Sequence, residues 1–368
     1  MSSSKLSVGI VGLPNVGKST LFTALTRNEV LIANYPFATI DPAVGIVAVP
    51  DSRLATLSAI SGSHDIIPAV IEFVDIAGLV EGAASGEGLG NKFLANIRET
   101  DMIGQVVRIF EDEDIHHVAG RIDPRGDIEV INLELVLADA ETVEKRLGNA
   151  ERDAKRGDKD AVVERDLLVR LKQHLADGLL ANQLEMNEDE QKAVKHLHLL
   201  TMKPFLYICN KKHGGMNLDD QSDERWHALL DVFDTTGVEY GVVDAGMEHE
   251  LRDLAEDEKM DFRREYGAQD SGIGTLIRAC YTRLGLMSYF TTGEKETRAW
   301  TVPIGSTGPK AAAAIHTDFE KKYIRAQVVT FADLVEYGSL AKAREAGKLR
   351  AEGKEYIVQD GDVIEFLI

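Results

Sequence analysis

The segment from Gly12 to Thr20 has residue types and spacing that can bind a chain of phosphates. It fits the pattern Gly-x-x-x-x-Gly-Lys-[Ser/Thr], in which the backbone N–H groups of the loop point at phosphate oxygens. Lys18 then reaches the outer phosphates and acts in catalysis, while Ser19 holds Mg²⁺. The segment therefore predicts a nucleotide site made of Asn15, Val16, Gly17, Lys18, Ser19 and Thr20.

A second motif, Asp75-Ile76-Ala77-Gly78, fits Asp-x-x-Gly. In a phosphate-loop enzyme this aspartate holds Mg²⁺ and the glycine N–H senses the γ-phosphate, so we expect Asp75 to be a metal ligand and Gly78 to act in catalysis. Between the two motifs, Thr39 can supply another metal ligand when a triphosphate orders its loop. A solvated turn is the alternative interpretation of that loop.

The residues that would recognise the base depart from the pattern of GTPases. Asn210-Lys211-Lys212-His213 stands where GTPases have Asn-Lys-x-Asp, so the carboxylate that accepts hydrogen bonds from guanine is missing. A site without that acceptor discriminates poorly in favour of guanine. We predict base recognition by Asn210 and Lys211, with Ala245 in the second base-contact loop, and a preference for ATP over GTP.

Strand, glycine loop and helix follow one another in the order that these motifs require. Residues 1–131 alternate strand-like runs with glycine loops and helical stretches, which indicates a parallel sheet covered on both faces. This pattern resumes at about residue 200 and continues to about 288. The expected fold is therefore α/β, with residues 1–131 plus 200–288 forming one nucleotide-binding domain.

Two further units are expected outside that domain. Residues 132–199 have apolar residues at helical spacing, such as Leu133, Leu137, Val143 and Leu147, and Gly157-Asp158 divides them into two runs. This pattern predicts a helical hairpin with a coiled-coil-like seam, although two ordinary helices packed on the core would give the same pattern. Residues 289–368 predict a small β-grasp-like module, in which Asp360-Gly361 has the composition of a hairpin turn.

Composition narrows the class of protein. The chain has 368 residues, a formal net charge of −20 and 44% hydrophobic residues, which favours a globular protein and argues against one that coats DNA or RNA indiscriminately. There is no run of about 18 apolar residues and no leader-like start, so we expect a cytoplasmic protein with no membrane partner. Cys209 and Cys280 are expected to be buried, reduced thiols.

Several segments together resemble one known family. Asn34-Tyr35-Pro36-Phe37, the Asp75 motif with the glycines that follow it, and the C-terminal His316 to Lys321 are similar to the Obg-like ATPases of the YchF type. The resemblance extends over nearly the whole chain. It implies a P-loop GTPase-type (G) domain, a helical hairpin insertion, a C-terminal TGS domain, ATP hydrolysis and association with ribosomes. His213 departs from the family pattern, which usually has glutamate there.

The resemblance also assigns residues that the motifs leave open. Leu79 follows Asp-x-x-Gly and cannot orient a water molecule, so the intrinsic rate is expected to be low. A histidine proposed for this role in the family corresponds to His117, although a surface or loop-anchoring histidine is an alternative. Asn15 resembles the asparagine that helps hold K⁺ in potassium-stimulated relatives, and a hydrogen bond that stabilises the loop is equally consistent with it.

Together with this resemblance, the motifs predict a Mg²⁺-dependent, ribosome-associated ATPase that acts as a nucleotide-dependent switch in translation or the stress response. The expected partners are ATP or GTP and the ribosome, with the large subunit as its docking site. Basic residues of the C-terminal module suit contact with rRNA phosphates, or else form a solvated surface; they are Lys342, Arg344, Lys348, Arg350 and Lys354. Two rival functions remain, an Obg-type GTPase translation factor and a nucleotide-sensing regulator that acts mainly by binding proteins.

Overall fold

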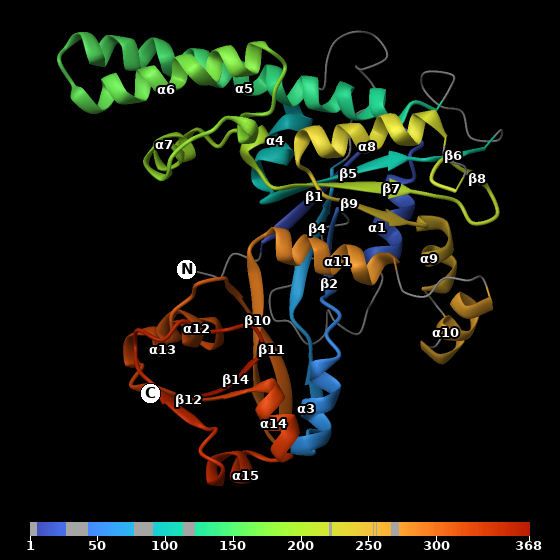
Figure 1. The fold of residues 1–368 in the computed structure, drawn as a ribbon, viewed down its shortest axis with the longest axis vertical. Helices are drawn as coiled ribbons and strands as arrows, with labels where there is room; N and C mark the ends of the chain where they lie inside the picture. The colour runs from blue at the N-terminus through green and yellow to red at the C-terminus, as the bar shows by residue number, and fades with distance from the viewer. Residues whose placement is uncertain are drawn as a thin grey trace.

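A computed structural model describes residues 6–26, 43–76, 91–112, 122–220, 223–252, 254, 256–265 and 272–368. Two mixed sheets of six strands organise these residues, one near each end of the molecule (Figure 1). A long pair of helices extends from the upper sheet. The α/β fold that the sequence predicts is confirmed.

The upper sheet carries the nucleotide motifs. Its order is β2-β4-β1-β5-β7-β9, with β2 antiparallel to β4 and every other pair parallel. The strands are β1 (Ser7–Val11), β2 (Val44–Ala48), β4 (Val70–Asp75), β5 (Met102–Arg108), β7 (Phe205–Asn210) and β9 (Tyr240–Val243). β5 is buried throughout, as expected of a central strand between two helical layers.

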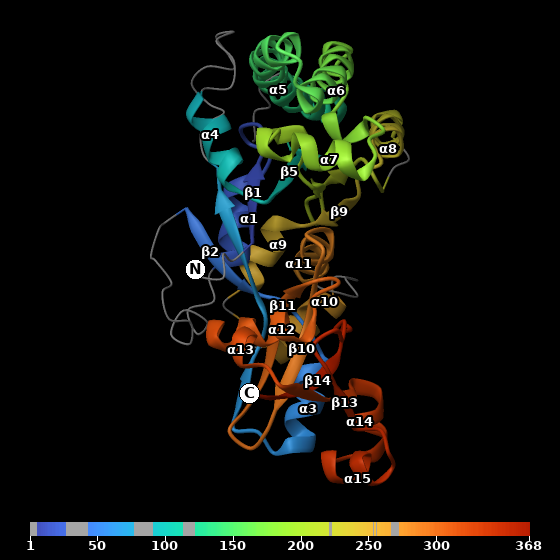
Figure 2. The ribbon, with the colours of Figure 1, turned by 90° about the vertical axis from the view of Figure 1, so that its left-hand side faces the viewer.

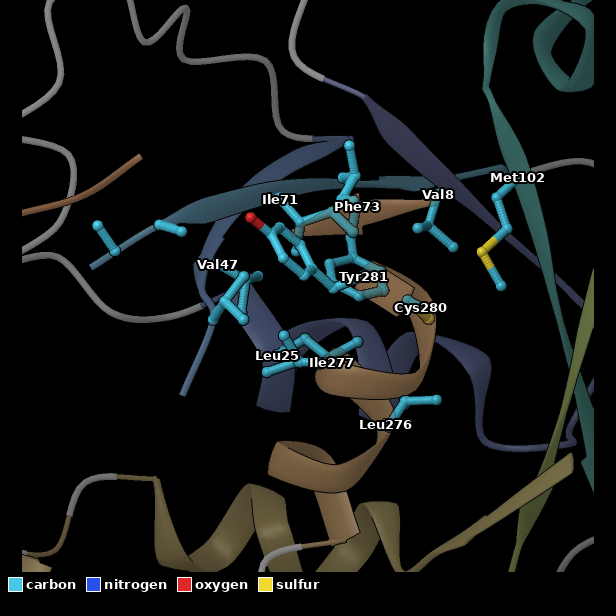
Figure 3. Packing of buried hydrophobic residues seen from close by; sticks show 14 of the residues in the cluster. Val8, Leu25, Val47, Ile71, Phe73, Met102, Leu276, Ile277, Cys280 and Tyr281 are labelled. Carbon is cyan, nitrogen blue, oxygen red and sulfur yellow. The ribbon is translucent and has the colours of Figure 1, made fainter. Parts of the chain in front are cut away.

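Helices cover both faces of this sheet. One face packs on α1 (Lys18–Thr26) and α11 (Gly272–Arg283), and in Figure 3 Leu25, Ile277 and Tyr281 lie around Ile71 and Phe73 of β4. The other face packs on α4 (Asn91–Glu99), on the first part of α5 (Pro124–Lys155) and on α8 (Glu224–Thr236). At the ends of the strands lie α9 (Ala245–Leu251), α10 (Glu256–Glu265) and a short ribbon of β6 (Phe110–Glu111) with β8 (Met216–Asn217).

The helical hairpin is present. α5 pairs with α6 (Lys159–Ala176), and a separate cluster of buried residues, including Val143, Leu147 and Leu171, fills the seam. Leu133 and Leu137, expected among the seam residues, are instead 53% and 55% exposed, because α5 begins at Pro124 and its first part faces the sheet through other positions. The chain returns through η1 (Ala181–Gln183), α7 (Glu188–Val194), η2 (Lys195–Leu197) and η3 (Leu200–Met202).

A buried aspartate of α5 anchors the return segment. The Asp139 carboxylate accepts hydrogen bonds from the Leu200 and Thr201 N–H groups, both at 2.8 Å, and from the Thr201 hydroxyl at 2.6 Å. Burial raises the pKa of Asp139 above its usual range, and these three donors oppose that shift. The base of the hairpin is therefore tied to the segment that leads into β7.

The C-terminal sheet has the order β13-β12-β14-β10-β11-β3. Its strands are β10 (Leu286–Thr292), β11 (Glu296–Pro303), β12 (Arg325–Thr330), β13 (Arg350–Glu352) and β14 (Asp362–Leu367), with β3 (Asp65–Ile67) from the N-terminal third of the chain. Helices α12 (Gly308–Ile315) and α13 (Thr317–Lys322) lie on one side, and α3 (Arg53–Ser61), α14 (Phe331–Tyr337) and α15 (Leu340–Glu345) lie toward the other (Figure 2).

Asp360-Gly361 is a turn, with Gly361 at a φ of 87°, but the hairpin expected around it is wrong. β14, which follows the turn, pairs with β12 and β10, whereas Ile357 before the turn forms a single bridge to Thr307. The expected burial of the thiols is confirmed: Cys209 and Cys280 are free and fully buried, and burial raises the pKa of Cys280 to about 12. The predicted domain limits remain a proposal. α5 crosses the limit at 131, β3 is a strand of the C-terminal sheet, and α3 packs against α14 and β14.

Candidate nucleotide site

The phosphate loop connects β1 to α1 in the geometry that the motif requires. Asn15 and Gly17 have positive φ angles, 65° and 92°, which turn the chain between strand and helix. A Cβ atom on Gly17 would lie 2.1 Å from Nδ2 of Asn210, so this position has no room for a side chain. Ser19 and Thr20 lie in the first turn of α1, with Ser19 exposed.

Lys18 and Asp75 meet at the start of α1. β1 and β4 are parallel neighbours with Ile10 opposite Asp75, so the carboxyl ends of both strands reach the same edge of the sheet. There the Lys18 ammonium forms an ion pair with the Asp75 carboxylate. The structure therefore brings together the two charged groups that the sequence assigned to phosphate and to metal.

Asn210 links three segments that are distant in the sequence. Its side-chain Nδ2 donates to the Val16 carbonyl at 2.9 Å, and its Oδ1 accepts from the Ala245 N–H at 3.0 Å. The side chain is buried, with 3% exposed. Three predicted nucleotide-binding residues thus form one continuous hydrogen-bonded chain from the phosphate loop to the second base-contact loop.

The loop after β7 is held by acidic residues that sequence reasoning did not assign. The Asp244 carboxylate accepts from the backbone N–H of His213 and from that of Met247 at 2.8 Å, where it caps α9. Both of its oxygens therefore accept bonds from the backbone. The capping role had a local signal, an aspartate directly before a helical stretch.

Asp219 also lies in this region, and its Oδ2 is 3.9 Å from the Lys211 ammonium. Burial raises the pKa of Asp219, and the positive charge of Lys211 opposes the shift. Asp219 follows Lys211 by eight residues outside any motif, so no spacing rule could have found it. Lys211 itself is fixed at the backbone by a 2.9 Å bond from its N–H to the Val243 carbonyl.

A buried arginine lies at the end of β5, opposite Asn210 of β7. Arg108 is 1% exposed, and its Nε donates to the Phe110 carbonyl at 3.0 Å. Burial lowers the pKa of Arg108, while Asp112, Asp127 and Glu111 act in the opposite direction. Sequence reasoning did not single out this residue, since arginine within an apolar strand run carries no motif.

The described residues are suited to Mg²⁺ bound together with phosphate. Mg²⁺ commonly takes one or two protein oxygens and completes its shell with phosphate oxygens and water. Asp75 and the Ser19 hydroxyl offer such a set, and the residues described contain no group of three or more His, Cys, Asp or Glu that could hold a metal unaided. The other predicted site residues, Thr39, Gly78 and His117, lie outside the described residues.

No helix within the described ranges is long and apolar enough to cross a membrane.

Two family models match parts of the chain. A family model described as a 50S ribosome-binding GTPase matches residues 7–137. The C-terminal model of YchF GTPases, described as a protein of unknown function, matches residues 286–368.

Similar proteins cover the whole chain. A Bacillus subtilis protein called ribosome-binding ATPase YchF is 51% identical over 98% of each chain, and an Escherichia coli O157:H7 protein of the same name is 47% identical over 98% of each. The solved structure of the Schizosaccharomyces pombe YchF GTPase has a TM-score of 0.90 and 35% identity, covering 100% of this chain and 99% of that one.

Proposed function

The chain belongs to the YchF family, and from this premise we propose that it is a ribosome-associated nucleoside triphosphatase that hydrolyses ATP in preference to GTP. It acts as a nucleotide-dependent switch in translation or the stress response. The observation that carries the hydrolase assignment is the meeting of Lys18 and Asp75 beside the phosphate loop.

Each residue of the loop has a task in the proposed reaction. N–H groups of the loop cradle the phosphates, and Lys18 moves its ammonium from Asp75 to the outer phosphate oxygens. The released Asp75 and the Ser19 hydroxyl are then available to Mg²⁺, with Thr39 as a third ligand. Mg²⁺ supplies neutralisation of the charge on the phosphates. Gly78 is proposed to sense the γ-phosphate and His117 to orient the attacking water.

The proposed preference for ATP rests on the residue at position 213 and on the acid that contacts its backbone. Position 213 is a histidine, and the nearby Asp244 already accepts two backbone hydrogen bonds, so neither supplies a free carboxylate for the guanine edge. One observation favours the rival function of an Obg-type GTPase. Lys211 occupies the lysine position of the GTPase motif Asn-Lys-x-Asp. The second rival function is a nucleotide-sensing regulator that acts mainly by binding proteins. Leu79 favours it, because a leucine cannot orient the attacking water and hydrolysis would then be slow.

The proposed partner is the ribosome, and the large subunit is the proposed docking site because the matched model describes a 50S ribosome-binding GTPase. The cytoplasm is the proposed location, because the proposed partner works there. K⁺ is proposed as a second ion near Asn15, whose side chain lies at the exposed bend of the phosphate loop.

The test is a titration of nucleotide-free protein with fluorescent ATP and GTP in Mg²⁺ buffer, with either K⁺ or Na⁺ as the salt, followed by turnover measurements. We expect tighter binding of ATP and turnover that is faster in K⁺. Equal or tighter binding of GTP would overturn the preference and favour the Obg-type rival. A Lys18→Ala protein that still performs the cellular role would favour the regulator.

A further inference from the structure

Between β2 and β4 of the upper sheet, the chain contributes one strand, β3, to the C-terminal sheet. β3 pairs in parallel with β11, with Asp65 opposite Glu296 and Ile67 opposite Arg298. The His64 N–H also donates to the Glu294 carbonyl at 3.0 Å. The chain thus leaves the upper sheet along β2, enters the C-terminal module and returns along β4.

Side-chain hydrogen bonds reinforce this junction at the end of α3. The Ser63 hydroxyl donates to the Gly293 carbonyl at 2.7 Å, and the Thr292 hydroxyl donates to the Ser61 hydroxyl at 2.8 Å. Leu54 and Leu57 of α3 are buried in the same apolar cluster as Leu334 of α14. α3 is consequently packed as part of the C-terminal module, as Figures 1 and 2 show from two sides.

An ion pair fixes the other end of α3. The Arg53 guanidinium lies 2.6 Å from Asp360, also pairs with Asp51, and stacks over the Phe290 ring at 4.9 Å. Asp360 in turn accepts the Ser288 N–H at 3.0 Å. A Cβ atom on Gly361 would lie 2.9 Å from the guanidinium, so Asp360-Gly361 forms the receiving surface for Arg53.

The opposite end of the same segment reaches the nucleotide site. β2 and β4 pair from Ala48 opposite Val70 to Val44 opposite Val74, and the Asp75 N–H donates to the Ala43 carbonyl at 2.8 Å. From Ile67 in the C-terminal sheet to Asp75, an extended chain spans on the order of 25 Å. One nearly continuous run of backbone therefore joins the C-terminal sheet to the carboxylate that pairs with Lys18.

The junction is not closed on every side. A cleft of about 860 Å³ lies beside the ion pair, lined by residues of α3, α11, β10 and the Asp360 turn, including Arg53, Arg278, Met287 and Ile304. The cleft leaves the outer side of the ion pair open, while Leu54 and Leu57 of α3 share one buried cluster with Ile277 and Tyr281 of α11.

We propose that residues 43–76 couple the nucleotide site to the C-terminal module, with the Arg53–Asp360 ion pair as the contact that transmits the coupling. When Lys18 releases Asp75 to bind phosphate, β4 and β2 adjust together, and the adjustment reaches β10, β14 and α14 through α3 and β3. Coupling is reciprocal, so a partner that holds the C-terminal module also changes nucleotide affinity. The inference rests on nucleotide binding at the proposed site.

The test is hydrogen–deuterium exchange of the full-length protein with and without Mg²⁺ and a non-hydrolysable ATP analogue. In the wild type we expect altered exchange in peptides from β10, β14 and α14 as well as in the phosphate loop. Asp360→Asn and Arg53→Gln should each abolish the C-terminal response and change the affinity for the analogue at least about fivefold. Asp318→Asn is the matched control, since it removes an exposed ion pair to Lys322 within the same module.

The possible outcomes separate this inference from the proposed function. Absence of analogue binding to the wild type would overturn the nucleotide site itself, and the coupling with it. Binding that alters only the phosphate-loop peptides would overturn the coupling and leave the hydrolase assignment intact. The coupling is also overturned if both variants retain the C-terminal response, or if Asp318→Asn abolishes it as they do.

Discussion

At the residue scale, the site depends on polar side chains that bond to backbone groups of distant segments. The Asn210 side chain donates to the Val16 carbonyl and accepts from the Ala245 N–H. The Asp244 carboxylate accepts from the N–H groups of His213 and Met247. Buried polar groups without such partners would be costly. These residues therefore shape the loops before any nucleotide arrives, whatever contacts they later make with a base.

Asn210→Ala should weaken binding of ATP and GTP by similar factors. The substitution removes both hydrogen bonds and leaves the Val16 carbonyl and Ala245 N–H buried without them, a cost of about 1–3 kcal/mol, or roughly 5- to 150-fold in affinity. Titration with the two fluorescent nucleotides measures the effect. A loss confined to one nucleotide would show that Asn210 reads the base directly.

Asp75→Asn should separate metal binding from phosphate binding. Removing the carboxylate charge weakens the hold on Mg²⁺ and should lower turnover by about 100-fold. In EDTA, where no Mg²⁺ is available, the variant should bind ATP at least as tightly as the wild type. In the wild type Lys18 must give up its ion pair with the Asp75 carboxylate to bind phosphate, and in the variant that ion pair is absent. Weaker binding than the wild type in EDTA would contradict the role assigned to the Lys18–Asp75 ion pair.

At the element scale, helix ends fix the loops around the nucleotide. Asp244 caps α9 beside the base loop, and Asp223 caps α8 and also binds Arg225. Arg225 continues to Glu111 of β6 at 2.7 Å, so the start of α8 is tied to the segment after β5. The caps at the starts of α8 and α9 therefore also hold the loops next to these helices in place.

Loss of the Asp223 cap should lower the free energy of unfolding by an amount that depends on pH. Hydrogen bonds from Arg225 lower the pKa of Asp223 to about 2, below the value of about 3.9 in an unfolded chain. Since the folded pKa is the lower one, the carboxylate stabilises the fold above pH 4, and this stabilisation disappears as the pH falls through about 2. Asp223→Ala should cost about 1 kcal/mol at pH 7, measured by urea unfolding.

Asp223→Asn provides the control, because asparagine keeps a capping oxygen and loses the charge. Its deficit relative to the wild type should shrink as the pH is lowered from 4 toward 2. A deficit that is constant over this range would mean that the Arg225 interaction does not depend on the charge of Asp223.

At the scale of the whole molecule, one apolar core joins the two sheets. The cluster that contains Leu21 and Leu25 of the phosphate-loop helix also contains Leu57 of α3, Leu334 of α14 and Val363 of β14. The helical hairpin has a cluster of its own. The C-terminal module is therefore expected to unfold together with the nucleotide-binding sheet.

The two tryptophans offer a direct test of this cooperativity, because Trp226 lies in α8 and Trp300 lies in β11. The Trp226→Phe variant keeps Trp300 as its only tryptophan, in the C-terminal sheet. The Trp300→Phe variant keeps Trp226, beside the upper sheet. In urea, each variant should give the same midpoint by fluorescence as by circular dichroism. If the Trp300 signal changes at a lower urea concentration than the overall transition, the module is an independent unit.

Sequence patterns predict those parts of this protein that depend on interactions between near neighbours along the chain. The phosphate loop, the strand that ends at Asp75 and the break between helices at Gly157-Asp158 follow from short spacings and from turn chemistry, and the structure has each of them. The resemblance to the YchF family came from the same local motifs. Thr39, Gly78 and His117 remain predictions that the described residues do not test.

Contacts between distant segments depend on the packing of the whole fold. Asp360-Gly361 has the composition of a hairpin turn, yet it receives Arg53 from 307 positions away. Leu133 and Leu137 fit a helical seam, but the packing of α5 on the sheet leaves them exposed. Helical and turn patterns are set by interactions between residues a few positions apart. The pairing of β3 with β11 instead depends on how whole elements pack, and the spacing of residues along the chain does not predict such packing.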